Sequence, residues 1–293
     1  MAMKILAIGD FQGKFPKKLQ KQLKKESFDA VIGVGDYTGL DEWRPFIMAQ
    51  LSAAKQGGPA PEAEEFFGRK RYKILRDKDY EFGRKILDKI NSFNKPTFVV
   101  FGNTDWYNYP FQRDFVDTFH QKKSYDKYVK KLRNIHNINY KKSRFQEMDL
   151  VGFGGYMDIE SYFDKREWKQ SENRRKIERR LRRHDKAREK LFYLMKKTKS
   201  PSVLVLHYPP FGVFDIIKGG KDNPMNGKSA GVKFFSEVIK KSKPLFVLCG
   251  HMHEYHGMKK LHGVPVINPG DAGNGKCAIV TLEDRRVSVK FIK

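Results

Sequence analysis

Nine short apolar runs punctuate the chain, and longer polar stretches separate many of them. The runs are rich in Val, Ile and Phe and are too short for most helices, so they predict buried β-strands. Polar stretches with helical character lie between them, for example at residues 17–25, 80–93 and 228–241. Strands that alternate with helices indicate an α/β fold. The predicted strands are Lys4–Ile8, Ala30–Val34, Thr97–Phe101, Leu150–Phe153, Ser202–Leu206, Leu245–Leu248, Val264–Ile267, Cys277–Leu282 and Val287–Ile292.

The last three of these strands lie close together in the sequence. Turn residues separate them, at 268–270 and at Glu283 and Asp284. Short turns usually join antiparallel neighbours, so the tail is predicted to be antiparallel.

Length and composition set the class of protein. The chain has 293 residues, 39% apolar and 32% charged, which is ample for one large α/β domain. No run of about 18 apolar residues occurs, so no membrane-spanning helix and no membrane partner are expected. The first ten residues hold too short an apolar segment for a signal-peptide core. Cys249 and Cys277 lie in apolar runs and indicate buried thiols in a reducing compartment, so a cytoplasmic location is expected. The sequence does not specify an oligomeric state.

Three segments are predicted as insertions into a single domain of residues 1–293, near 41–80, 110–133 and 164–198. Residues 52–65 of the first are rich in Ala, Gly and Pro, which indicates a mobile loop. The second is aromatic and basic, with no clear strand. Residues 164–197 of the third contain 15 Lys or Arg and 6 Asp or Glu. Steps of three and four there predict a long helix with one narrow apolar stripe. The stripe consists of Ile177, Leu181, His184, Arg188, Leu191 and Met195.

The net charge of +25 has two interpretations. A Lys-rich, solvated surface keeps a protein soluble, and a basic surface also attracts polyanions such as nucleic acid. The charge alone favours the solvated surface, because net charge says nothing about the geometry that a polyanion site needs. For the basic helix near 164–198, the apolar stripe favours packing on a sheet, and a contact with phosphates is the alternative.

Polar side chains end five of the predicted strands. In α/β sheets, ligands gather beyond the carboxyl ends of the strands, so these side chains are expected to meet. Carboxylate, amide oxygen and imidazole together suit Mn, Fe, Zn, Co or Ni, and an Asp can bridge two such ions. The strand-end residues are Asp10, Asp36, Asn103, His207, and His251 with His253.

The motifs at these positions resemble those of the calcineurin-like metallophosphoesterases. The chain reads GDFQG, GDY, GNTD, LHYPP and GHMHE in the family's order, and the resemblance spans about residues 4–292. The stretch of residues 206–254, which contains LHYPPFG, KSAG, FFSEVI and LCGHMHE, most resembles the small bacterial and archaeal branch of the family. The resemblance implies a four-layer α/β/β/α sandwich, in which two mixed sheets are flanked by helices and the metals lie at the strand ends.

The resemblance also implies a site with two divalent metal ions. Mn is the expected ion, and Fe, Zn, Ni and Co are the alternatives. Asp10, Gln12 and His253 would hold the first metal, and Asp36 would bridge to the second. Asn103, His207 and His251 would hold the second metal. Asp36, Asn103, Thr104 and Asp105 would form the catalytic set, with Asp105 as the acidic residue that follows the GNH motif.

Two residues depart from the family pattern. Gln12 replaces a His, and its neutral amide oxygen is a poorer ligand than imidazole, so a weaker first site that tolerates Mn or Mg is expected. Thr104 replaces the His that donates to the phosphate or protonates the leaving group. A hydroxyl can donate a hydrogen bond, but it is no proton source near pH 7. Small family members with Cys at this position are still phosphodiesterases.

Three functions follow from this pattern. The first is hydrolysis of a phosphoester, a diester rather than a monoester, by a hydroxide that the metals activate. The second is a weakened or inactive scaffold of the same fold, which Gln12 and Thr104 favour and the six intact strand-end ligands oppose. The third is a nuclease that holds a nucleotide or nucleic acid on its basic surface.

Overall fold

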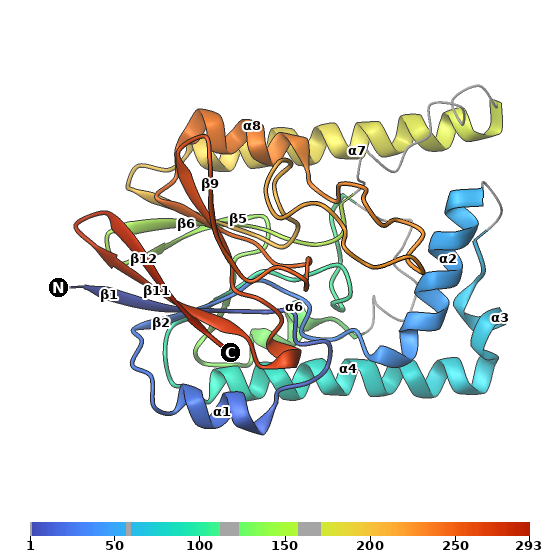
Figure 1. Cartoon of the computed structure of the whole chain (residues 1–293), viewed down its shortest axis with the longest axis horizontal. Helices are drawn as coiled ribbons and strands as arrows, with labels where there is room; N and C mark the ends of the chain where they lie inside the picture. The colour runs from blue at the N-terminus through green and yellow to red at the C-terminus, as the bar shows by residue number, and fades with distance from the viewer. Residues whose placement is uncertain (1, 57–59, 112–122, 158–170) are drawn as a thin grey trace.

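A computed structural model of the chain describes residues 2–56, 60–111, 123–157 and 171–293. Within these ranges the strands form two mixed six-stranded sheets (Figure 1). The first sheet has the order β12 (Arg286–Ile292), β11 (Cys277–Glu283), β1 (Met3–Ile8), β2 (Ala30–Gly33), β3 (Thr97–Val99), β4 (Ile135–Asn137). The second has the order β5 (Lys141–Phe145), β6 (Met148–Phe153), β7 (Ser202–Leu206), β8 (Phe246–Leu248), β10 (Val264–Asn268), β9 (Gly257–Leu261).

Alternate residues of the strands serve two different cores. Ile5 and Ala7 of β1 belong to a cluster with Phe246 and Leu248 of β8. This cluster lies between the two sheets. The intervening Leu6 and Ile8 belong to a second cluster, which includes the buried faces of the helices. Because side chains alternate across a strand, each fully apolar strand can bury both faces. The four-layer sandwich expected from the family resemblance is therefore confirmed.

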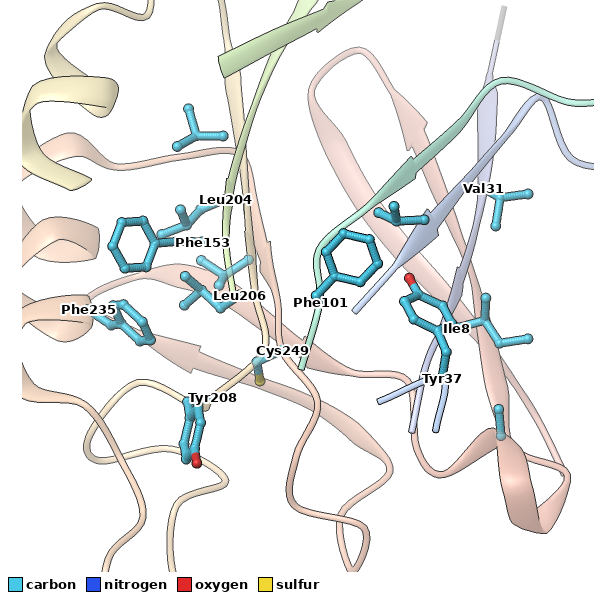
Figure 2. Packing of buried hydrophobic residues seen from close by; sticks show 14 of the residues in the cluster. Ile8, Val31, Tyr37, Phe101, Phe153, Leu204, Leu206, Tyr208, Phe235 and Cys249 are labelled. Atoms are coloured by element: carbon cyan, nitrogen blue, oxygen red, sulfur yellow. The ribbon is translucent and has the colours of Figure 1, made fainter. Parts of the chain in front are cut away.

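Helices cover the outer face of each sheet (Figure 1). On the first sheet lie α1 (Lys17–Leu23), α4 (Arg69–Asn91) and α6 (Tyr125–Val129). On the second lie α7 (Ser171–Lys196) and α8 (Lys233–Ser242), and Phe235 of α8 packs beside Phe153 of β6 (Figure 2). No helix in the described ranges is long and apolar enough to cross a bilayer.

All nine strands predicted from the sequence are present, and the described ranges contain three further strands that the prediction missed. β4, β5 and β9 each lie at the end of a sheet, and β5 and β9 are Lys-rich and largely exposed. Edge strands often carry charged residues, so no apolar run marks them. The prediction of an antiparallel tail is correct for β11 and β12 but wrong for β10. β10 lies in the second sheet, parallel to β8 and antiparallel to β9.

The predicted insertions contain more helix than expected. The mobile loop assigned to residues 52–65 is wrong at both ends, because α2 (Arg44–Gln56) extends to Gln56 and α3 (Ala63–Phe67) begins at Ala63. Ala, Gln, Lys and Glu favour helix, and this propensity outweighs the nearby Gly and Pro. In the second segment, residues 112–122 lie outside the described part of the chain, and α6 follows them. Residues 158–170 of the third also lie outside it.

The long basic helix is present as α7. Its predicted stripe is buried at Ile177, Leu191 and Met195, whereas Arg188 is exposed and Ala187 takes the buried position beside it. Arg188 instead pairs with Glu237 of α8 at 2.9 Å.

Candidate metal centre

The predicted ligands meet where the parallel strands of both sheets end. Asp10, Asp36 and Asn103 follow β1, β2 and β3, which are parallel neighbours in the first sheet. His207 follows β7, and His251 and His253 follow β8, which is parallel to β7 in the second sheet. The two sheets therefore bring candidate ligands from opposite ends of the sequence into one site. The structure thus brings these strand-end side chains together at one place.

The donor atoms fall into two groups that share one residue. One group contains Asp36, His207 and His251, and the other contains Asp10, Asp36 and His253. Within each group the donor atoms all lie within 4.8 Å of one another. Asn103 belongs with the first group, since its Oδ1 is 2.9 Å from both His207 Nε2 and His251 Nδ1. Asp36 is thus placed to serve two cations, as expected for a bridging ligand.

The hydrogen bonds of His207 leave it with a lone pair that faces other acceptors. Its Nδ1 is 2.9 Å from the carbonyl oxygen of Val34, which can only accept, so Nδ1 carries the proton. Burial lowers the pKa of His207, which keeps the ring neutral. Nε2 therefore points a lone pair at Asn103 Oδ1, and it is also 3.4 Å from Asp36 Oδ1. Acceptors crowded together in this way are satisfied by a cation between them.

The carboxylates of the site also lack a compensating charge. Asp10, Asp36 and Asp105 are all buried, and no Lys or Arg in the described ranges forms an ion pair with them. Burial first, and then the charge of Asp36, raises the pKa of Asp10 and of Asp105 well above the usual range. A buried carboxylate pair favours any bound cation. The donor set and its electrostatics therefore fit divalent metals.

Four positions in the ligand loops adopt backbone angles that are rare for residues other than glycine. The φ angles of Asp10, Gln12, Asp36 and His251 are 54°, 49°, 54° and 67°. Each such left-handed residue costs of order 1 kcal/mol, and such residues cluster at functional sites.

Comparison with known proteins now decides the family. A family model described as metallophosphoesterase, calcineurin superfamily, matches residues 1–292. The chain belongs to this family. Its members are metal-dependent phosphoester hydrolases with a dinuclear divalent metal site, so the metallophosphoesterase described here is a hydrolase by family. No curated protein matches it.

Solved structures support the fold. One structure matches 100% of both chains with 17% identity and a TM-score of 0.64. The TT1561 protein of Thermus thermophilus matches over 99% of both chains, with 16% identity and a TM-score of 0.53. A dimetal phosphatase from Danio rerio has 13% identity and a TM-score of 0.52, over 99% of this chain and 96% of its own. At such identities the likeness shows the fold alone.

Gln12 reaches the site through its nitrogen, not its oxygen. Its Nε2 lies 3.2 Å from Asp36 Oδ2, to which it donates, and 3.4 Å from His253 Nε2. Its Oε1 faces Gly39 instead. The expectation that the amide oxygen of Gln12 binds the first metal therefore does not match this orientation, because an amide N–H cannot ligate a cation. The contact with an acceptor oxygen explains the orientation.

Thr104 has no free donor for a phosphate. Its hydroxyl donates to the carbonyl oxygen of Thr38 at 2.9 Å, and a hydroxyl has one proton to donate. Its backbone N–H donates to Asp36 Oδ1 at 3.1 Å. The Thr104 hydroxyl is thus not available for the expected hydrogen bond to substrate. Thr104 instead orients the carboxylate of Asp36 through its backbone N–H.

Asp105 lies behind the donor atoms. Its carboxylate accepts the backbone N–H groups of Asp36, Tyr37, Thr38 and Gly102, at 2.7–3.3 Å. These bonds tie the loop after β2 to the loop after β3, so Asp105 positions Asp36 and Asn103.

The sequence pattern missed two acids that support the site. Asp271 is buried, and its Oδ2 lies 3.9 Å from His253 Nδ1, which leaves the Nε2 of that ring toward Asp10. Asp79 of α4 accepts N–H bonds from Gly39, Leu40 and the Trp106 indole. Its signal was an acid on the apolar face of a helix, four residues from Leu75 and from Gly83, both buried.

Two other polar residues make structural hydrogen bonds. Asn268 donates to the Met252 carbonyl and accepts from Gly270 N, so it holds the loop that carries His251 and His253. His256 Nε2 lies 3.2 Å from the Cys277 carbonyl oxygen, and the His256 ring packs on Phe291.

Proposed function

We propose that the metallophosphoesterase hydrolyses a phosphodiester at a dinuclear site formed by the two donor groups that share Asp36. The observation that carries the proposal is the convergence of these groups around one buried carboxylate without a compensating basic side chain in the described part of the chain. Asp10 and His253 are assigned to the first metal, and Asn103, His207 and His251 to the second. When bound, the ions would lower the pKa of a water molecule and neutralise charge on the phosphoryl oxygens.

The chain's own residues support the proposal of a diester substrate. The hydroxyl of Thr104 donates to the Thr38 carbonyl oxygen, and an alcohol is no proton source near pH 7, so Thr104 does not protonate a leaving group. A substrate with a good leaving group needs no such proton. Activated or nucleotide-type diesters therefore fit the site better than alkyl monoesters.

Metal identity and location are part of the same proposal. Mn is the favoured ion, because the first metal is offered two carboxylates and one imidazole while Gln12 supplies no oxygen to it. Both cysteines are free and buried, which is consistent with a reducing cytoplasm. We further propose that residues 1–293 form a single domain with the three insertions.

The test compares two small substrates with protein loaded with Mn. Turnover of bis-p-nitrophenyl phosphate is expected to exceed that of p-nitrophenyl phosphate, and metal-free protein should hydrolyse neither. Metal content is measured in parallel by elemental analysis. Protein that binds no metal and shows no metal-dependent turnover would support the non-catalytic scaffold instead, and a preference for the monoester would contradict the diester assignment.

Gln12→His is expected to strengthen the weaker metal site. An imidazole at this position replaces an N–H donor with a ligand nitrogen beside Asp36 and His253, so affinity for the second equivalent of Mn should rise by about tenfold or more. Calorimetric titration measures this directly. Gln20→His is the control, because Gln20 lies on α1, outside the site, and donates to the Phe15 carbonyl. Unchanged affinities in Gln12→His would place position 12 outside the ligand set.

A further inference from the structure

We propose that the exposed face of α7 binds the phosphate backbone of a single-stranded nucleic acid. Four cations lie along this face, at steps of four, three and four residues. With a rise of 1.5 Å per residue they span about 16 Å along one side of the helix. A row of this length can contact several phosphates of one strand at once, whereas a small anion would contact only one or two of the four cations. The row consists of Arg175, Arg179, Arg182 and Lys186.

The charges of this row are not paired with acids of the described residues. All four side chains are exposed, and none forms an ion pair with an acid in the described part of the chain. The neighbouring Arg174 pairs with Glu178, and Arg188 pairs with Glu237. Acids thus pair with cations beside the row, whereas the four cations of the row remain available to a ligand.

The packing of α7 explains why this face is open. The second half of the helix is held to the sheet by Ala187, Leu191, Leu194 and Met195, all buried. The first half extends past the end of α8 toward the end of the molecule to which β1 points (Figure 1). The metal centre lies beyond the carboxyl ends of the strands, so the row of cations begins on the side of the site.

A second basic segment lies at the same end. The start of α4 also projects there, on the opposite side of the strand ends (Figure 1). Arg69, Lys70, Arg71 and Lys73 are exposed on it, and Phe66 of α3 beside them is 42% exposed. Exposed rings give bases a surface to stack on, and cations follow the backbone. A strand held by α7 can therefore continue past the site to α4.

The chemistry of the row favours nucleic acid over a membrane surface. A helix that lies in a bilayer interface needs an exposed apolar face beside its basic one. The apolar stripe of α7 is committed to the protein interior, and the described exposed positions from 174 to 186 are all charged. A polyanion without an apolar layer fits this face.

Binding is tested on the full chain with fluorescent 20-mers of oligo(dT) and oligo(U), by anisotropy over a range of salt concentrations. The measurement without added metal avoids cleavage, so it does not depend on the proposed hydrolysis, and it is repeated with Mn. The variant Arg175→Gln, Arg179→Gln, Arg182→Gln, Lys186→Gln should bind at least about tenfold more weakly, with a salt slope smaller by about 3. The two oligomers decide between DNA and RNA as the preferred strand.

The matched control removes four charges from the other side of the molecule. Lys17, Lys18, Lys21 and Lys24 lie on and just after α1, which covers the first sheet (Figure 1). Neutralising them to Gln should leave affinity within about twofold. Both variants should keep the wild-type melting temperature and turnover of the small diester. Equal losses in both variants, no binding by the wild type, or binding to phosphatidylserine vesicles but to neither oligomer would each overturn the proposal.

Discussion

Asp36→Asn is expected to lower phosphodiester turnover by at least about 10³-fold, because this one carboxylate serves both donor groups. The amide is neutral and offers one oxygen in place of two, so neither ion keeps its full set of ligands. Metal content should fall in parallel with turnover. The assay is hydrolysis of bis-p-nitrophenyl phosphate in Mn, with bound metal counted on the same sample.

The stability of this variant separates a lost ligand from a lost fold. In the wild type, burial raises the pKa of both Asp10 and Asp105, and the Asp36 charge raises it further by repulsion among buried carboxylates. Removing it should leave the melting temperature of metal-free protein unchanged or higher. Mn should raise the melting temperature of the wild type, as any ligand of the native state does, but not that of the variant.

Asp149→Asn is the control for Asp36→Asn. Asp149 is also a buried carboxylate, but it accepts from the backbone of Lys199 and Ser200, at the far end of β6 from the site. This change should cost stability and leave bound metal and turnover per folded molecule intact. A variant at position 36 that keeps both its metals and its activity would refute the assignment of Asp36 as the shared ligand.

Gly102→Ala is expected to destabilise the protein by about 3 kcal/mol and to disrupt the site. A Cβ at this position would lie 2.0 Å from Asp36 Oδ1 and 2.6 Å from both Asp36 N and His207 Cε1. These atoms cannot move without displacing a proposed ligand. The backbone N–H of Asp36 donates a hydrogen bond to Asp105, and His207 Nδ1 donates one to the Val34 carbonyl oxygen. Urea denaturation gives the loss of stability, and Mn titration gives the loss of affinity.

Gly257→Ala is the matched control. A Cβ at Gly257 meets no atom within 4 Å, and the residue lies in the edge strand β9 with an ordinary backbone angle. Its stability should stay within about 0.5 kcal/mol of the wild type. If Gly102→Ala were equally harmless, the close contact between the loops after β2 and β3 would not be needed for the metal centre.

The fold could be predicted from the sequence where burial and chemistry coincide. Strands that bury both faces are largely apolar, so β1, β7 and β8 could be predicted, and so could the candidate ligands Asp10, His207 and His251 that follow them. The edge strands β4, β5 and β9 carry no such run. The sheet to which β10 belongs depends on pairing partners, and turn length alone does not set them.

The side-chain orientations within the site could not be predicted from the sequence. The orientation of the Gln12 amide and the use of the Thr104 hydroxyl depend on side-chain torsions, and these follow from contacts with Asp36 and Thr38 that only the folded chain brings together. Asp79 and Asp271 act through backbone groups and through another ligand, so no motif of metal-binding type marks them.

The pairing of β1 with β11 has a consequence for how the molecule is made. Met3 lies opposite Leu282 in this ladder, so a central strand of the first sheet waits for a partner from the far end of the chain. During synthesis β1 can pair only with β2, and its other edge stays open until β11 has left the ribosome. Pairings this distant in sequence fold slowly and leave strand edges exposed to other chains. Completion of the first sheet therefore comes late in folding, and until then the open edge of β1 is available for pairing with other chains.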